Sequence, residues 1–178
     1  MNVVPYSPEW PLLFDGIAES LREALRGVPI VGIEHVGSTS VPGLAAKPII
    51  DVDIVARREF VDQAITALAA AGYEHRGNLG LIDREAFVAP DEAPRRNVYL
   101  CVDGTLHLRN HLAVRAALRA SPALRHRYAE IKTRLASDPA MTVERYLAGK
   151  SAVLQDVLAA SDLTAEEKRQ IYALNTSM

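Results

Sequence analysis

The chain has 178 residues, 49% of them hydrophobic and 24% charged, with a formal net charge of −2. These values are typical of one globular domain, and the weak net charge argues against a broad nucleic-acid-binding surface, which needs a concentrated basic excess. Cys101 is the sole cysteine, so no intramolecular disulfide can form. No apolar run approaches the ~20 residues that span a membrane, and the first residues lack the pattern of a signal peptide. We therefore expect a cytoplasmic protein with no membrane partner.

The first third of the sequence predicts one helix followed by two strands. Ser7 can cap a helix with Pro8 in its first turn, and leucine and isoleucine then recur at four-residue steps up to residue 25. Residues 29–36 and 48–55 are rich in valine and isoleucine, which favours strands. Residues 48–55 are apolar at nearly every position except two aspartates, as expected of a central strand that is buried on both faces.

The remaining elements follow the same periodicities. We expect a helix over 58–71, strands over 84–89 and 96–102, and helices over 105–119, 121–136, 142–160 and from 165. Ser121 opens the second of these last helices, and residues 164–167 form a capping box at the start of the final one. The strands are confined to 29–102, and only helices follow, which predicts an α+β fold. We expect a single domain over 1–178, with an α/β core of about 1–104 and a C-terminal helical layer of about 105–178.

Two carboxylates interrupt the most apolar predicted strand. Asp51 and Asp53 are two positions apart, so on a strand both point to the same face. They could be solvated carboxylates of an edge strand, but their neighbours are too apolar for an exposed edge. Because burying two acids costs several kcal/mol unless something compensates them, we interpret the pair as a catalytic site for a divalent cation. Mg²⁺, or Mn²⁺ in its place, suits these oxygen ligands.

A candidate phosphate-binding turn precedes this strand. Gly37 allows close approach of the backbone to a phosphate, and Ser38 can donate a hydrogen bond to it. Lys47, just before the second strand, could reach a phosphate from the rim of the site.

The segment HVGSTSVPGLAAKPIIDVDI resembles the signature of the GrpB family (UPF0157-type), a branch of the polymerase-β-like nucleotidyltransferase superfamily. The superfamily pattern is a Gly-Ser turn followed by Asp-x-Asp, and twelve residues separate Ser38 from Asp51 here. Later segments also resemble GrpB proteins, so the similarity covers nearly the whole chain. It implies a nucleotidyltransferase-like mixed sheet of about four to five strands with flanking helices. It also implies a protein that binds a nucleoside triphosphate with Mg²⁺ and transfers a nucleotidyl group to an unknown acceptor.

The resemblance extends to further site residues. Arg84 matches a position of the substrate pocket, and Arg115, Lys132 and Lys150 match positions that the family commonly fills with basic residues. The resemblance implies that Arg84, Arg115 and Lys150 bind the phosphates of the nucleotide, and that Lys132 could contact them. Active members of the superfamily usually add a third carboxylate from a neighbouring strand, but residues 96–102 contain no acid. Asn97, as a weaker oxygen ligand, and Glu85, on the preceding strand, are the alternatives.

Two other functions are compatible with the sequence. The first is a non-catalytic nucleotide-binding or adaptor module, linked to coenzyme A metabolism because some relatives are fused to dephospho-CoA kinase. The second is a helical interaction protein, which predicts an exposed apolar stripe on residues 105–160. No motif specifies the base, the acceptor or the oligomeric state.

Several weaker patterns favour ordinary structural roles. Residues 149–151, Gly-Lys-Ser, match the end of a P-loop, but no strand or first glycine precedes them. His107 and His111 have the spacing of helical metal ligands but lack the accompanying acid. We expect His35 to pack or to make a supporting hydrogen bond, and Cys101 to be a small buried residue.

Overall fold

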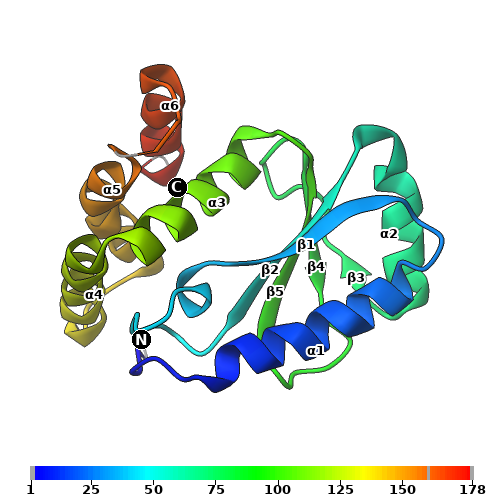
Figure 1. Cartoon of the computed structure of the whole chain (residues 1–178), viewed down its shortest axis with the longest axis horizontal. Helices are drawn as coiled ribbons and strands as arrows, with labels where there is room; N and C mark the ends of the chain where they lie inside the picture. Colours follow the sequence, from blue (N-terminus) through cyan, green and yellow to red (C-terminus); the bar gives the residue numbers. More distant parts are fainter. Residues whose placement is uncertain (1–2, 160, 177–178) are drawn as a thin grey trace. The chain divides into compact units, whose positions relative to one another are not determined.

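The structure is a computed structural model that describes residues 3–159 and 161–176 (Figure 1). The strands are β1 (Ile30–Val36), β2 (Ile50–Ala56), β3 (Glu74–His75), β4 (Arg84–Val88) and β5 (Arg96–Val102). The α-helices are α1 (Glu9–Ala24), α2 (Val61–Ala70), α3 (Leu106–Ala120), α4 (Pro122–Ser137), α5 (Val143–Ala159) and α6 (Ala165–Thr176). Two short 3₁₀ helices, η1 (Ser38–Ser40) and η2 (Arg58–Phe60), complete the set.

The strands form one five-stranded mixed sheet in the order β1-β2-β5-β4-β3. β2 and β5 are parallel, and the other neighbouring pairs are antiparallel. The predicted α+β class with a mixed sheet is therefore confirmed. The prediction missed β3, a two-residue strand that is too short to produce a periodic pattern.

The described chain divides into two compact units. One consists of Pro8–Val36 and Ile49–Leu108, and holds the sheet with α1 and α2. The other combines Met1–Ser7, Gly37–Pro48 and Arg109–Met178, and holds α4, α5, α6 and most of α3. Below, these are the sheet unit and the helical unit.

The two faces of the sheet differ in chemistry. The ring of Phe14 in α1 stacks on His35 of β1, with centroids 4.7 Å apart, so α1 lies on the face of His35. In register with His35, this face carries Val52 and Val98, which are 0% and 1% exposed. His35 is thus a packing residue, as expected. The alternate residues of each strand point to the opposite face, which carries the aspartates of β2.

β2 lies between β1 and β5. Six of its seven residues are buried, and Asp51 is half-buried. The prediction of a central strand is confirmed, and an exposed edge strand is excluded.

The helical unit has its own hydrophobic core. Val41 and Leu44, from the segment that follows η1, are fully buried against residues of α3, α4 and α5, namely Leu118, Tyr128, Val153 and Val157. Segment 37–48 therefore packs with helices that lie far along the sequence.

The predicted helix caps had different outcomes. Ser121 caps α4 by accepting a 3.3 Å hydrogen bond from the amide of Leu124. Thr164 and Glu167 form the predicted capping box at the start of α6. At α1 the cap position is one residue later than predicted, because Pro8 occupies it instead of Ser7.

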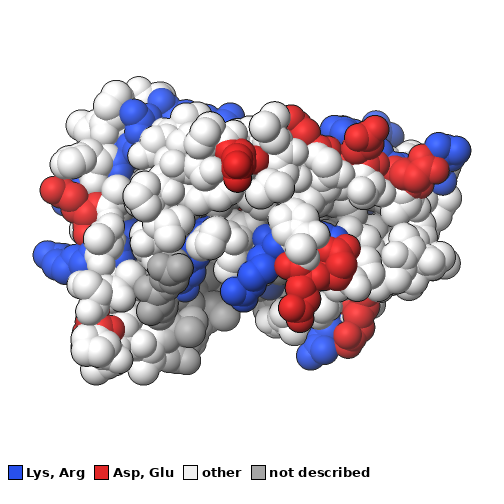
Figure 2. Space-filling model, turned by 90° about the horizontal axis from the view of Figure 1, so that it is seen from below, with Lys and Arg blue, Asp and Glu red and all other residues white. Residues whose placement is uncertain are grey.

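The surface is mixed in charge on the face that Figure 2 shows, where basic and acidic side chains lie next to one another. Among the described residues, no helix is long and apolar enough to cross a membrane.

Candidate functional site

The two aspartates of β2 lie on the sheet face opposite α1. In the strand register, Asp51 is opposite Val36 on one side and Asn97 on the other, whereas Asp53 is opposite Glu34 and Tyr99. Asp53 is 0% exposed. A carboxylate buried in a central strand needs compensation of its charge, which fits a binding role better than a solvated surface role.

Asn97 contacts the first aspartate directly. Its Nδ2 donates a 2.7 Å hydrogen bond to Asp51 Oδ1. Asn97 thus orients the Asp51 carboxylate through its amide nitrogen, rather than adding a third oxygen beside it. Within the described residues, no three His, Cys, Asp or Glu side chains are grouped so that they could hold a metal ion.

These donors fit a divalent cation that takes two protein carboxylates and completes its shell with water or phosphate oxygens, as Mg²⁺ commonly does. Asp51 and Asp53 would hold the ion, which would neutralise negative charge on a bound phosphate.

Glu85 does not join this pair. It is in register with Leu100 of β5, whereas the aspartate face carries Tyr99, so strand alternation places Glu85 on the other face. There its carboxylate contacts His75 Nε2 at 2.7 Å. The expectation that Glu85 could be a third metal ligand with the aspartates is therefore corrected.

Glu34 is an acid of the aspartate face that the sequence analysis did not consider. It lies directly opposite Asp53 in the antiparallel β1–β2 pair. The alternation of Glu34 and Val36 with Ile33 and His35 was the available signal, but it has meaning only once the pairing register is known.

Arg84 joins the aspartate face from β4. Its guanidinium carbon lies 4.4 Å from the ring centroid of Tyr99, and its Nη1 lies 3.4 Å from Nε2 of His107. Burial raises the pKa of Tyr99, the charge of Arg84 opposes that shift, and the charges of Asp51 and Asp53 add to it. Arg84, Tyr99 and the two aspartates thus form one electrostatic cluster.

Cys101 lies on the same face but is 0% exposed. Burial, followed by the charge of Asp53, raises the pKa of the thiol above its ordinary range. The thiol stays protonated at neutral pH and is an inert packing group, as expected.

The predicted phosphate-binding turn belongs to the helical unit. Gly37 has φ 69° and ψ −172°, a conformation that a side chain would strain. The 3₁₀ helix η1 follows, and Ser40 closes the turn by donating its hydroxyl to the Gly37 carbonyl at 2.6 Å. The glycine is thus required by the backbone of the turn itself.

Lys132 of α4 holds this turn. Its Nζ donates to Ser38 Oγ at 2.7 Å and to the Ala45 carbonyl at 3.0 Å, and the residue is 3% exposed. Arg119 of α3 donates twice to the Ser40 carbonyl, at 3.0 and 2.6 Å. Two cations from distant helices therefore converge on η1. Lys132 was among the residues expected to contact a phosphate, whereas Arg119 was not a candidate.

Two predicted phosphate ligands share one aromatic ring. The Nζ atoms of Lys47 and Lys150 lie 4.8 and 4.6 Å from the ring centroid of Tyr146 in α5. Arg115 lies on α3 and is half-buried. Lys150 and the preceding Gly149 are inside α5, so the resemblance to a P-loop was fortuitous, as expected.

A family model and several known proteins match this chain, and they are described as GrpB or UPF0157 proteins. The family model described as "GrpB protein" matches residues 1–160. The chain is 34% identical to the UPF0157 protein BH1888 of Halalkalibacterium halodurans over 167 residues, covering 92% of this chain and 84% of that one. It is also 34% identical to the UPF0157 protein YqkA of Bacillus subtilis over 151 residues, which are 84% of this chain but only 44% of that longer relative.

A solved structure of a GrpB protein also matches this chain. The crystal structure of conserved protein GrpB from Enterococcus faecalis matches with a TM-score of 0.77 at 31% identity, covering 96% of this chain and 99% of that one. A weaker likeness is to the Cid1 poly(U) polymerase bound to MgATP, with a TM-score of 0.49 and 15% identity over 74% of this chain and 45% of that one. The second value is too low to bear on function.

Proposed function

Because this chain belongs to the GrpB family, we propose that it binds a nucleoside triphosphate with Mg²⁺ and transfers its nucleotidyl group to an acceptor. The observation that carries the proposal is the pair Asp51 and Asp53 on one face of a buried central strand. The same face presents polar groups from β1, β2, β4 and β5, which is unusual for a buried sheet face and typical of a binding surface.

We assign the phosphates of the nucleotide to the turn and the lysines of the helical unit. Gly37 and Ser38 would donate to the β- and γ-phosphates, and Lys47, Arg115 and Lys150 would neutralise their charge. The two ammonium groups at the ring of Tyr146 favour an anionic ligand.

The proposed reaction is a substitution at phosphorus. An acceptor oxygen forms a bond to the α-phosphorus while the bond from that phosphorus to the bridging oxygen breaks. Pyrophosphate leaves with the electron pair, and the acceptor proton is released to water. Arg84 would neutralise a further anion on the aspartate face.

A non-catalytic nucleotide-binding module is the second candidate. The observation that favours it is the missing third acid, since among the residues that the structure describes no group of three acids, histidines or cysteines could hold a metal. This module would bind the nucleotide without turnover.

A thermal-shift panel of nucleotides, each with and without Mg²⁺, tests the proposal. A ligand at a hundredfold excess over its dissociation constant should stabilise the protein by ~2.7 kcal/mol. We expect one nucleotide to stabilise the wild type only with Mg²⁺, and expect Asp53→Asn to lose that effect. Release of pyrophosphate in the presence of candidate acceptors then separates an enzyme from a binding module.

The matched control is Asp103→Asn, which removes an exposed carboxylate of the same unit. It should keep the nucleotide response of the wild type. A panel that is flat for the wild type contradicts nucleotide binding, and an equal loss in both variants contradicts the assignment to Asp53.

A further inference from the structure

Arg84 is an unusual arginine within the sheet unit. Arg58, Arg76 and Arg96 of that unit each form an ion pair with a carboxylate, Asp83, Glu74 and Asp91 respectively. Among the residues described in the structure, no carboxylate forms such a pair with Arg84, and its Nε is buried without a hydrogen-bond partner. A partly buried guanidinium in this state has an unused donor at Nε and a positive charge with no direct ion-pair partner.

The surroundings hold Arg84 in place. The small side chain of Ala86 lies opposite Tyr99 in the register, which leaves room for the guanidinium to stack on the Tyr99 ring at 4.4 Å. Nη1 faces the ring nitrogen of His107 at 3.4 Å. Stacking has already restricted the arginine side chain, so it loses little further conformational freedom when an anion binds.

The position of Arg84 relates it to the aspartates. Tyr99, on whose ring Arg84 stacks, lies directly opposite Asp53 in the β2–β5 register, and Asp51 lies two residues away on the same face of β2. Two carboxylates and an arginine with an unused donor on one face can hold a cation and an anion side by side.

We propose that Arg84, stacked on Tyr99, is an anion subsite for the acceptor, and that the acceptor therefore bears a phosphate or carboxylate group. The reference to an acceptor rests on the proposed function. The subsite itself does not, because anion binding to Arg84 can be measured without a nucleotide. The anion of the acceptor would lie at Arg84, separate from the phosphates of the nucleotide.

The first experiment is a titration of the full chain with inorganic phosphate. NMR chemical shifts of the Arg84 Nε–H and of the backbone amides of β4 and β5 report the binding. A parallel titration with succinate distinguishes a phosphate from a carboxylate preference. We expect saturable shifts at these strands with one of the two probes. Arg84→Gln should weaken binding by at least about tenfold, since hydrogen bonds to charged groups carry much of the affinity for an anion.

Two further variants separate loss of the site from loss of the fold. Arg84→Lys keeps the charge but loses the planar fork, so it should bind phosphate more weakly than the wild type and more tightly than Arg84→Gln. Arg57→Gln removes an exposed arginine of the same unit and should bind phosphate as the wild type does. If neither probe gives saturable shifts with the wild type, the proposal is wrong.

A second titration is made in the presence of Mg²⁺ and the nucleotide chosen by the thermal-shift panel. Phosphate or succinate that still binds at Arg84 supports a separate acceptor subsite. Competition between the probe and the nucleotide overturns it and assigns Arg84 to the nucleotide phosphates. If no nucleotide binds but phosphate does, the proposed function fails while the anion subsite stands.

Discussion

The side-chain amide of Asn97 donates a 2.7 Å hydrogen bond to the Asp51 carboxylate across the parallel β2–β5 pair. The sequence analysis offered Asn97 as a weaker ligand in place of a third acid, and here its amide contacts Asp51. The arrangement stabilises Asp51 without a cation, since the amide supplies a donor to one of its oxygens.

Asn97→Asp should make the protein dependent on a divalent cation. The change replaces a hydrogen bond with two adjacent carboxylates, which should lower the free energy of unfolding by about 1 kcal/mol in the absence of metal. Mg²⁺ or Mn²⁺ should restore this stability and should bind more tightly than to the wild type. Urea unfolding with and without each cation measures both effects.

Asn78→Asp is the matched control for that experiment. Asn78 lies in an exposed loop, where its Oδ1 accepts a hydrogen bond from the Gly80 amide, a role that aspartate can also fill. This variant should show no response to the cation beyond that of the wild type. If the cation stabilises both variants equally, it does not bind at the carboxylate introduced at position 97.

Lys132→Met should destabilise the helical unit. The substitution keeps most of the apolar stem but leaves Ser38 Oγ and the Ala45 carbonyl without the donor that Lys132 supplies. Buried acceptors that lose their donor cost about 1–3 kcal/mol, which urea unfolding can resolve. Lys168→Met is the control, because its Nζ makes only long contacts of 3.4 and 3.3 Å to carbonyls. Equal losses in the two variants would contradict a special role for Lys132.

The sequence was sufficient for those parts of the site that depend on alternation within one strand. Asp51 and Asp53 share a face because they are two residues apart, and apolar neighbours on β2 indicated that the strand is central. The face of Glu85 could not be predicted in the same way. It depends on the register of β4 against β5, which is a property of the sheet and not of either strand alone.

The sequence also could not predict the contacts between segments that lie far apart along the chain. Lys132 and Ser38 are 94 residues apart, and no local pattern joins them. One signal was nevertheless present, since Lys132 follows buried Tyr128 by four residues and so lies on the apolar stripe of α4. A lysine on such a stripe needs a buried partner, although the sequence does not say which one.

Gly149→Ala should destabilise the packing of α5 against α4. A Cβ at Gly149 would lie 2.8 and 2.9 Å from the two Cδ atoms of Leu135, so the leucine must move. Overpacking typically costs about 1–3 kcal/mol, and the loss here should lie at the low end because the side-chain end of half-buried Leu135 can move. Gly16→Ala in α1 is the matched control, since no atom lies within 4 Å of its added Cβ. It should stabilise the protein by about 0.5–1 kcal/mol, and a similar gain at Gly149 would contradict the close contact.

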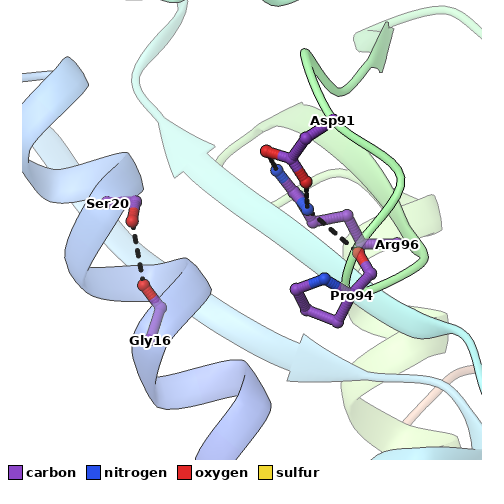
Figure 3. A network of polar contacts seen from close by, with 5 residues as sticks. All are labelled: Gly16, Ser20, Asp91, Pro94 and Arg96. Carbon is purple, nitrogen blue, oxygen red and sulfur yellow. Dashed lines mark hydrogen bonds and ion pairs between the residues drawn. The ribbon is translucent and has the colours of Figure 1, made fainter.

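The ion pair of Asp91 and Arg96 predicts a specific loss of stability in acid. Figure 3 shows the carboxylate facing the guanidinium, with hydrogen bonds of 2.7 and 2.9 Å, while Arg96 also donates to the Pro94 carbonyl at 2.9 Å. The hydrogen bonds from Arg96 hold the pKa of Asp91 below its ordinary value. A lowered pKa in the folded state contributes stability above the ordinary pKa, and this contribution disappears as the pH falls through the lowered value.

Asp91→Asn should therefore reduce the loss of stability that the protein shows between neutral and acidic pH. At neutral pH the variant should unfold at a lower temperature than the wild type. The two melting temperatures should converge as the pH falls from about 4, the ordinary pKa of aspartate, through the lowered pKa of Asp91. Added salt should narrow the difference at neutral pH, because the carboxylate is exposed. Glu92→Gln, which removes the neighbouring exposed carboxylate, should not reproduce this convergence. A constant difference between wild type and Asp91→Asn at every pH would show that the charge of Asp91 contributes nothing to stability.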